Sequence, residues 1–195
     1  MKKYFEITLI DNPNMSVCEL WSKFYMQLHL ALVEQQDQQG KIPIGISFPE
    51  YRYESKKGGY LGNKVRMFAQ DENLLQLLDL NKWFAHLADY IHCTSIREVP
   101  SDRVITYAQY RRYHVKGNFG NLARRRAKRH KMSLDEAIKH YQSKAYTSDL
   151  PYIQLKSLTN QQSFRLFIEK RKRNELTQDG FGTYGLSSSS TVPEF

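Results

Sequence analysis

The segment 121–131 has the residue types most suited to holding a polyanion. Its basic residues are Arg124, Arg125, Arg126, Lys128, Arg129 and Lys131, six within eight consecutive positions. In a helix, Arg125, Lys128 and Arg129 would lie on one face. Like-charged pairs at spacings of three and four each cost roughly 0.2–0.5 kcal/mol, a cost that a bound polyanion would reverse. The single sign of the charges favours a nucleic-acid contact over a merely solvated face.

A second basic stretch, 104–116, alternates aromatic with charged residues. As a strand it would place Tyr110, Arg112 and His114 on one side, with Tyr107, Arg111 and Tyr113 on the other. Such interleaving suits stacking on bases with phosphate contacts nearby. The alternative is a half-buried strand with solvated basic side chains.

His29 is the histidine best placed for chemistry. In an amphipathic helix whose apolar stripe centres near Leu28, His29 falls about 100° to one side, at the rim of the stripe. An imidazole there could serve as a general acid or base, although a lone histidine at a helix edge is more often structural.

Metal and cofactor chemistry find little support. His86 and His92 lack neighbours at ligand spacing, and there is no HExxH motif, no carboxylate cluster, no P-loop and no dinucleotide-binding fingerprint. Cys18 and Cys93 have no CxxC partner. We therefore expect no metal and no cofactor. A nuclease built this way must rely on acid, base and positioning, which RNA permits because its 2′-hydroxyl supplies the nucleophile.

The charge of the chain is unevenly distributed. The 195 residues carry a net charge of +9, but residues 1–100 hold 11 Lys and Arg against 12 Asp and Glu, whereas residues 101–195 hold 18 against 8. The second part is thus the one expected to hold an acidic polymer. The basic segment lacks the apolar face of a membrane-surface helix, and neither a signal peptide nor a membrane span is recognisable. We expect a cytoplasmic protein with no membrane partner.

The elements expected in the first part follow the order β-α-β-β-α-β. Strands are predicted over 3–10, 42–48, 60–69 and 90–99. A helix begins at the Ser16/Glu19 capping box and runs to about 35, and a second follows Asp71 and runs to about 87. This order predicts a ferredoxin-like domain over 1–100.

The second part, 101–195, is predicted to be an α+β RNA-binding region with an arginine-rich helix, which makes the whole chain α+β. After that helix, Ser133 and Glu136 form a capping box for a helix to about 143. Strands are expected over 150–157, 164–170 and the glycine-rich 180–186. The serine-rich end, 187–195, is expected to be low complexity unless a partner orders it.

Several segments together resemble one family, the CRISPR precursor-RNA-processing endoribonucleases of the type I-F systems. They are LHLALVEQ (28–35), IGISFP (44–49), LGNKVRMFA (61–69), the strand and basic helix from 107 to 130, QLKS (154–157), SFRLFI (163–168) and GFGTYGLS (180–187). The resemblance implies a ferredoxin-like domain joined to an RNA-holding region. It also implies metal-independent cleavage at the base of the CRISPR repeat stem-loop, leaving a 5′-hydroxyl and a 2′,3′-cyclic or 3′-phosphate, with the guide RNA hairpin retained in a surveillance complex with other subunits.

The resemblance implies roles for particular residues near the cut. The catalytic histidine of the family falls on His29, its catalytic serine on Ser157, which would hold the 2′-hydroxyl, and its active-site tyrosine on Tyr184, which would position His29. Phe164 matches the aromatic residue that stacks on the terminal base pair. The alternative for Phe164 is an ordinary core position.

The resemblance also implies residues for RNA recognition. Arg112 matches an arginine that reads a guanine near the stem base, a bidentate contact common in specific recognition. His114 stands where the family usually has a glutamine that pairs with an adenine. The groove-facing positions of the basic helix fall on Arg125, Lys128 and Arg129. Lys128 stands where the family usually has arginine, so it keeps the charge but cannot make bidentate hydrogen bonds.

Three functions stay open at this stage. The first is a metal-independent endoribonuclease that retains its product, and the second is a structured-RNA-binding subunit of a ribonucleoprotein that does not cleave. His29, Ser157 and Tyr184 discriminate between them, because binding alone needs none of the three. A DNA-binding regulator is a third possibility, and it would be indifferent to replacing a ribose by deoxyribose.

Overall fold

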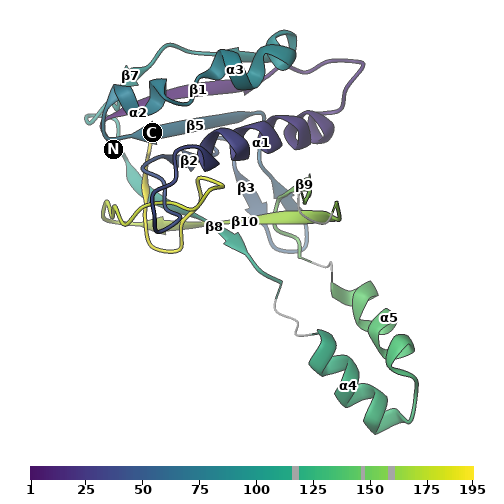
Figure 1. Ribbon diagram of the computed structural model, residues 1–195. Coiled ribbons are helices and arrows are strands. Elements are labelled where there is room, and N and C mark those ends of the chain that lie inside the picture. Colours follow the sequence, from purple (N-terminus) through teal and green to yellow (C-terminus); the bar gives the residue numbers. More distant parts are fainter. Residues whose placement is uncertain (116–118, 146–147, 158–160) are drawn as a thin grey trace.

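The computed structural model describes residues 1–115, 119–145, 148–157 and 161–195 (Figure 1). The glycine-bearing turn expected before the basic helix and the loop expected after residue 157 lie partly outside the described residues. The chain forms helices and antiparallel sheets, so the α+β class predicted from the sequence is confirmed.

The first sheet is built from strands of the first hundred residues. Its strands are β1 (Lys3–Leu9), β2 (Gly45–Ser47), β5 (Lys64–Ala69), β6 (Ile91–Cys93) and the short β7 (Arg97–Glu98). Their order is β2-β5-β1-β6, with β7 also paired to β1, and every pairing is antiparallel. The strand expected over 90–99 is thus two short strands.

Helix α1 (Val17–Val33) begins at the predicted capping box. The Ser16 hydroxyl accepts from the Glu19 amide at 3.3 Å, and the Glu19 carboxylate accepts from the Ser16 amide at 3.0 Å. The apolar stripe of α1 is buried, with Leu20, Phe24, Leu28 and Leu32 each no more than 1% exposed. In Figure 1 the helix lies between the two sheets, and it contacts strands of both of them.

The second predicted helix is broken into three short pieces. These are α2 (Glu72–Gln76), α3 (Leu80–Phe84) and the 3₁₀ helix η1 (Ala85–Tyr90). The break occurs because Asp79 adopts a left-handed conformation, with φ at 39°, and caps α3 by accepting from the Lys82 amide. The loop before β5 folds as its own hairpin of β3 (Arg52–Glu54) and β4 (Gly58–Tyr60).

The second sheet comes from the remainder of the chain. Its strands are β8 (Thr106–Tyr113), β9 (Tyr152–Lys156), β10 (Ser163–Arg173) and β11 (Val192–Glu194). Their order is β11-β8-β10-β9, again antiparallel throughout. One cluster of buried apolar residues includes members of both sheets and of α1, so the two sheets share a core.

Between β8 and β9 the chain forms two helices that pack on each other and lie to one side of the sheets (Figure 1). They are α4 (Phe119–His130) and α5 (Leu134–Ala145). Ala123 of α4 and Ala137 of α5 are fully buried. The predicted capping box of α5 is present, with Ser133 and Glu136 exchanging backbone to side-chain hydrogen bonds of 3.1 and 3.2 Å.

Two expectations for the end of the chain are wrong. The glycine-rich 180–186 is a looped segment with an isolated β-bridge between Phe181 and Ile42, and the Gly185 carbonyl also accepts from the Ile46 amide. The serine-rich end is ordered by its own chain, since Ser190 is 1% exposed, its hydroxyl donates to the Gly180 carbonyl at 2.8 Å, and β11 pairs with β8. Serine hydroxyls here satisfy loop backbone groups, a role that composition does not reveal.

Candidate active site

His29 lies on α1, half-buried, where the helix meets the loop 180–186. Its Nδ1 is 2.9 Å from the Thr183 carbonyl oxygen. A carbonyl oxygen can only accept, so Nδ1 must carry the hydrogen and donate it. In the neutral ring the lone pair is therefore on Nε2, which fixes the tautomer and leaves Nε2 available for proton transfer.

Tyr184 stacks on His29 and limits the directions that the imidazole can face. The two ring centroids are 4.1 Å apart and the rings are within 12° of parallel. Burial raises the pKa of the Tyr184 hydroxyl, an effect that the Arg112 charge partly offsets. The hydroxyl therefore stays protonated at neutral pH, where it can orient a neighbour but not act as a base.

The loop that carries Thr183 and Tyr184 is tightly fixed. The hydroxyl of Tyr25, fully buried on α1, donates to the Tyr184 carbonyl at 2.8 Å. Gly185 closes the turn with φ at 68° and donates to the Gly182 carbonyl at 2.7 Å, and its own carbonyl accepts from the Ile46 amide at 3.1 Å. Only glycine fits this position, because a Cβ would lie 2.2 Å from the Ile46 side chain.

The second sheet brings Arg112 and Phe164 to the same place. Arg112 pairs with Ile168 and Phe164 with Leu155, and paired or alternate residues share a face, so both side chains lie on the face that contains the buried Ile168 and Leu155. The Arg112 guanidinium is 5.4 Å from the Phe164 ring centroid and 5.8 Å from that of Tyr184. Both distances allow cation–π attraction.

Ser157 also lies at the second sheet, immediately after β9. Its amide donates to the Gln162 carbonyl at 2.9 Å, which extends the β9–β10 ladder by one step. It has the strand parity of Ile153 and Leu155, both buried on the face covered by α1, and is itself half-buried. The strand thus directs Ser157 toward the side on which His29 lies.

The predicted RNA-binding residues are divided between two places. Arg125, Lys128 and Arg129 are exposed on α4, away from the sheets, and His114 is exposed one residue beyond the end of β8. Of this group, Arg112 and Phe164 lie in the cluster around His29. We refer below to His29, Tyr184, Arg112 and Phe164 as the His29 cluster.

Two residues that hold His29 in place, Tyr25 and Thr183, were not predicted from the sequence. Tyr25 precedes His29 by four residues on α1, so the two share a helix face, and this spacing could have revealed it. Thr183 contributes a backbone carbonyl, for which no residue type is a signal.

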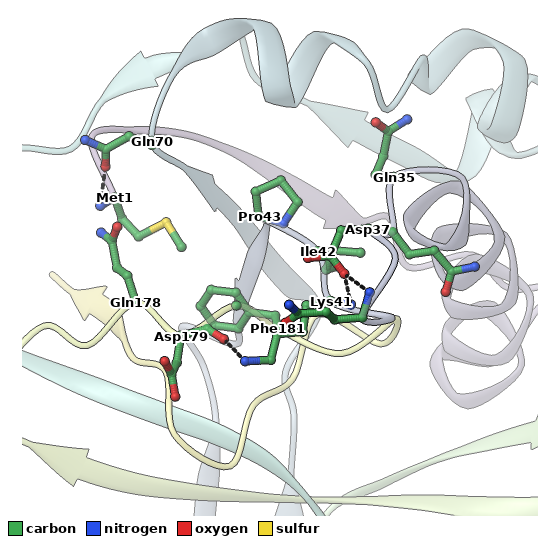
Figure 2. Close-up of a pocket in the computed structure, with 13 residues that line it drawn as sticks. Met1, Gln35, Asp37, Lys41, Ile42, Pro43, Gln70, Gln178, Asp179 and Phe181 are labelled. Carbon is green, nitrogen blue, oxygen red and sulfur yellow. Dashed lines mark hydrogen bonds between the residues drawn. The ribbon is translucent and has the colours of Figure 1, made fainter.

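Two further observations concern ligands. Among the described residues, no group of three or more His, Cys, Asp or Glu side chains comes together as a metal site. A cavity of about 630 Å³ lies between the loop after α1 and the segment 178–181, lined in part by Gln35, Asp37, Lys41 and Asp179 (Figure 2). No member of the His29 cluster lines it, so it is separate from the candidate site.

Within the described ranges, no helix is long and apolar enough to cross a bilayer.

Comparison with known proteins identifies the family. A family model described as "CRISPR-associated protein (Cas_Csy4)" matches residues 4–195, which makes this chain a CRISPR-associated protein. Two curated relatives are both named "CRISPR-associated endonuclease Cas6/Csy4". The one from Escherichia coli (strain UTI89 / UPEC) is 30% identical and the one from Pseudomonas aeruginosa (strain UCBPP-PA14) is 34% identical, each over 100% of both chains. The chain therefore belongs to the Cas6/Csy4 family of CRISPR-associated endonucleases, and the resemblance inferred from the sequence is confirmed at the level of the family.

A solved structure described as "An RAMP protein binding different RNA substrates" was also found. It has a TM-score of 0.39 and 9% sequence identity, and the alignment covers 98% of this chain and 100% of the other.

Proposed function

We propose that this protein is a metal-independent endoribonuclease that cleaves CRISPR precursor RNA at the base of the repeat stem-loop and retains the hairpin of the mature guide RNA. The observation that carries the proposal is the fixed tautomer of His29, whose Nδ1 is engaged by the Thr183 carbonyl and whose Nε2 is left for chemistry. Membership of the Cas6/Csy4 endonuclease family supports it.

The proposed reaction needs only the RNA and protein side chains. The 2′-oxygen next to the scissile phosphate attacks phosphorus, and the bond from phosphorus to the 5′-oxygen breaks. The proton of the 2′-hydroxyl leaves to a base, and a proton is delivered to the departing 5′-oxygen. The products are a 5′-hydroxyl and a 2′,3′-cyclic phosphate that can open to a 3′-phosphate. Neutral His29 can take the first proton through Nε2, and protonated His29 can supply the second.

The other residues near His29 would act by positioning the RNA and the imidazole. Ser157 would hold the 2′-hydroxyl by a hydrogen bond, and Tyr184 would keep the imidazole facing the phosphate. Phe164, whose ring centroid is 5.4 Å from the Arg112 guanidinium, would offer an aromatic platform for the terminal base pair. Holding nucleophile, phosphate and imidazole together converts an intermolecular encounter into an intramolecular step.

We assign stem-loop binding to α4 and to the end of β8. The exposed Arg125, Lys128 and Arg129 share one helix face and would contact the phosphates of the stem. Arg112 would read a guanine next to the cut, and His114 an adjacent base with one hydrogen bond. A long arginine enters an RNA major groove most readily near the open end of a short stem, because within a duplex the groove is deep and narrow.

We infer a division of labour along the chain. The strand order β2-β5-β1-β6 with its two helical crossovers supports a ferredoxin-like domain over residues 1–100, which would carry His29. Residues 101–195 would form the RNA-binding region with its arginine-rich helix. The retained guide RNA would join the protein to the other subunits of a type I-F surveillance complex.

The decisive experiment is cleavage and binding of a labelled repeat stem-loop in EDTA, by the wild type and by His29→Ala. We expect the wild type to cut and His29→Ala to bind equally well while its cleavage rate falls by at least about 100-fold, the usual contribution of one acid–base group. A substrate with deoxyribose at the nucleophilic position should bind and remain whole. Tight binding with no cutting by the wild type would favour the non-cleaving RNA-binding subunit, and cutting that ignores the deoxyribose would exclude the 2′-hydroxyl mechanism.

A further inference from the structure

Two cavities follow one another along the line where α1 packs on β9. The first, of about 400 Å³, is lined by Lys23, Gln27 and Lys156 among others, and the second, of about 420 Å³, by Trp21, Tyr60 and Tyr152 among others. Gln154 lines both of them. The two cavities therefore adjoin at Gln154, and we call them together the α1–β9 groove.

The α1–β9 groove begins next to residues that adjoin the candidate active site. Ser163 lines its first cavity, pairs with Lys156 across the β9–β10 ladder, and precedes Phe164 by one residue. The other wall of the groove is α1, which continues to His29. From Ser157 to Tyr152 the strand spans about 17 Å at roughly 3.3 Å per residue, enough for a few nucleotides in an extended strand.

The chemistry of the α1–β9 groove changes along its length. Near the active site it has exposed lysines, Lys23 and Lys156. Farther away it has exposed aromatic rings, since Tyr60 is 55% and Tyr152 is 44% exposed. No Asp or Glu is among the described residues that line either cavity. Cationic groups followed by stacking platforms are the features that hold single-stranded nucleic acid without regard to sequence.

We propose that the α1–β9 groove binds the single-stranded RNA that continues past the scissile phosphate, away from the retained stem-loop. This rests on the proposed function, because it places the scissile phosphate beside His29. The stem is assigned to α4 and Arg112, so the strand that leaves the site needs another path. The groove starts near the cut, has the matching charge and offers faces on which bases can stack.

The test compares two RNAs on the wild-type protein, both with deoxyribose at the nucleophilic position so that neither is cut. One ends just past the scissile phosphate, and the other continues as a short single-stranded flank. We expect the flank to increase affinity, and Tyr152→Leu to lose most of that increase, roughly tenfold for one stacked base. Tyr53→Leu is the matched control, since Tyr53 is 43% exposed and lines a different cavity. Equal unfolding temperatures show that both variants fold.

Salt dependence gives an independent readout. Lys23→Ala should reduce the slope of log affinity against log salt by about 0.7 for the flanked RNA, as expected for one lost phosphate contact on a single strand, with no change for the short RNA. Lys82→Ala is the matched control, because Lys82 is 52% exposed and pairs with Glu34 at 2.9 Å outside the groove.

The outcomes separate the two proposals. A flank that adds no affinity, or a gain lost equally in the Tyr152 and Tyr53 variants, would overturn the groove assignment and leave the groove to a polypeptide partner. Failure of the wild type to cleave an all-ribose stem-loop would overturn the proposed function instead.

Discussion

At the scale of single residues, the position and tautomer of His29 depend on groups that are themselves fixed by further contacts. Its Nδ1 partner is a backbone carbonyl, its stacking partner is Tyr184, and the carbonyl of Tyr184 accepts from Tyr25. Tyr25 and His29 lie on the same face of α1, so one helix both presents the imidazole and anchors the loop that orients it. Removing an interaction in this set should affect cleavage more than RNA binding.

The first prediction concerns Tyr25→Phe. The substitution leaves the Tyr184 carbonyl without its donor in a partly buried site, which costs at most about 1–3 kcal/mol. We expect the loop to loosen and the cleavage rate to fall several-fold, with affinity for an uncleavable stem-loop unchanged. Single-turnover cleavage and equilibrium binding measure the two effects.

Tyr53→Phe is the control for this prediction, because its hydroxyl is on an exposed side chain. Equal losses in the two variants, or a loss of affinity that matches the loss of rate, would show that Tyr25 does not act through His29.

At the scale of elements, the loop 180–186 is the piece on which the site depends most. It is neither helix nor strand, and its shape comes from hydrogen bonds to β2, to α1 and within itself. Gly185 is the position with the least freedom, because its φ is positive and Ile46 occupies the space that a side chain would need.

Gly185→Ala should therefore be damaging. A left-handed conformation with a Cβ costs roughly 1–2 kcal/mol, and the contact with Ile46 adds to it. We expect a lower free energy of unfolding in urea and weaker cleavage. Gly182→Ala is the matched control in the same loop, since its Cβ would meet the Leu186 carbonyl oxygen at an ordinary 3.5 Å. If the two variants behave alike, strain at Gly185 is not the cause.

Helix α4 allows a prediction of a different kind. If the exposed Arg125 and Lys128 each contact one phosphate of the stem, replacing both by alanine should reduce the slope of log affinity against log salt by about 2, because each contact contributes about 0.9. Cleavage at saturating RNA should be unaffected. A loss of affinity with an unchanged salt slope would contradict phosphate contact by these residues.

At the scale of the whole molecule, three tyrosine hydroxyls join the first part of the chain to the second. Tyr25 donates to the Tyr184 carbonyl at 2.8 Å and Tyr51 to the Ile168 carbonyl at 3.0 Å. The one hydrogen of the Tyr110 hydroxyl is shared between the Glu194 carboxylate at 2.9 Å and the Phe48 carbonyl at 3.1 Å. Burial raises the pKa of all three, for Tyr51 to about 12, and the nearby Glu194 carboxylate raises that of Tyr110 further.

These shifts predict alkaline instability. The folded protein keeps the three hydroxyls protonated at a pH where the unfolded chain, with pKa values near 10.0, has released them. Their contribution is fully present below about pH 10 and is lost as pH rises toward the folded values, by up to about 1.4 kcal/mol per pH unit for each tyrosine. Tyr51 contributes less, because it is partly exposed.

Urea unfolding between about pH 9 and 11 measures this fall in the free energy of unfolding. Tyr51→Phe should make the fall shallower, whereas Tyr53→Phe, an exposed site, should leave it unchanged. A free energy that does not fall above pH 10 would contradict the assignment.

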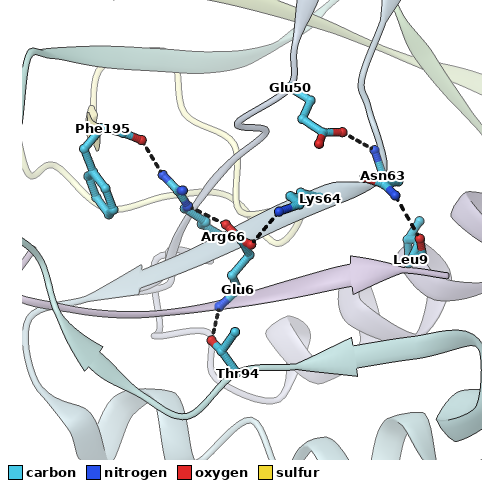
Figure 3. A network of polar contacts seen from close by, with 8 residues as sticks. All are labelled: Glu6, Leu9, Glu50, Asn63, Lys64, Arg66, Thr94 and Phe195. Carbon is cyan, nitrogen blue, oxygen red and sulfur yellow. Dashed lines mark hydrogen bonds and ion pairs between the residues drawn. The ribbon is translucent and has the colours of Figure 1, made fainter.

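A network around the Glu6 carboxylate makes stability depend on pH in the opposite direction, with a loss of stability at low pH. Burial raises the pKa of Glu6, but the hydrogen bonds and charges of Arg66 and Lys64 outweigh this and hold it below its usual value. Arg66 also donates to the Phe195 carbonyl at 2.7 Å and packs over its ring, so this network connects β1, β5 and residue 195 (Figure 3). Its contribution is present above the unfolded pKa and is lost as pH falls through the folded one.

Local sequence signals predicted much of this fold. The two capping boxes, the apolar stripe of α1 and the alternation in β1 and β8 act within a few residues, so they were readable. The shape of 180–191 was not, because it depends on partners such as Ile42, Ile46 and Tyr110 that are distant in sequence. The break at Asp79 is a local left-handed conformation that the residue types around it did not predict. His29 was only a weak candidate from its helix position, since its fixed tautomer comes from a backbone carbonyl 154 residues away.

Because α1 is anchored at Ser16 and again at His29, residues cannot be inserted or deleted between these two points without moving His29. Ser16 sets where the helix begins, and Thr183 and Tyr184 meet it at His29, so the residues between act as a spacer of fixed size. One inserted residue would turn His29 by about 100° and shift it by about 1.5 Å, away from both contacts. Insertions and deletions should therefore be excluded between Ser16 and His29, while the exposed tip of the β3–β4 hairpin should accept them.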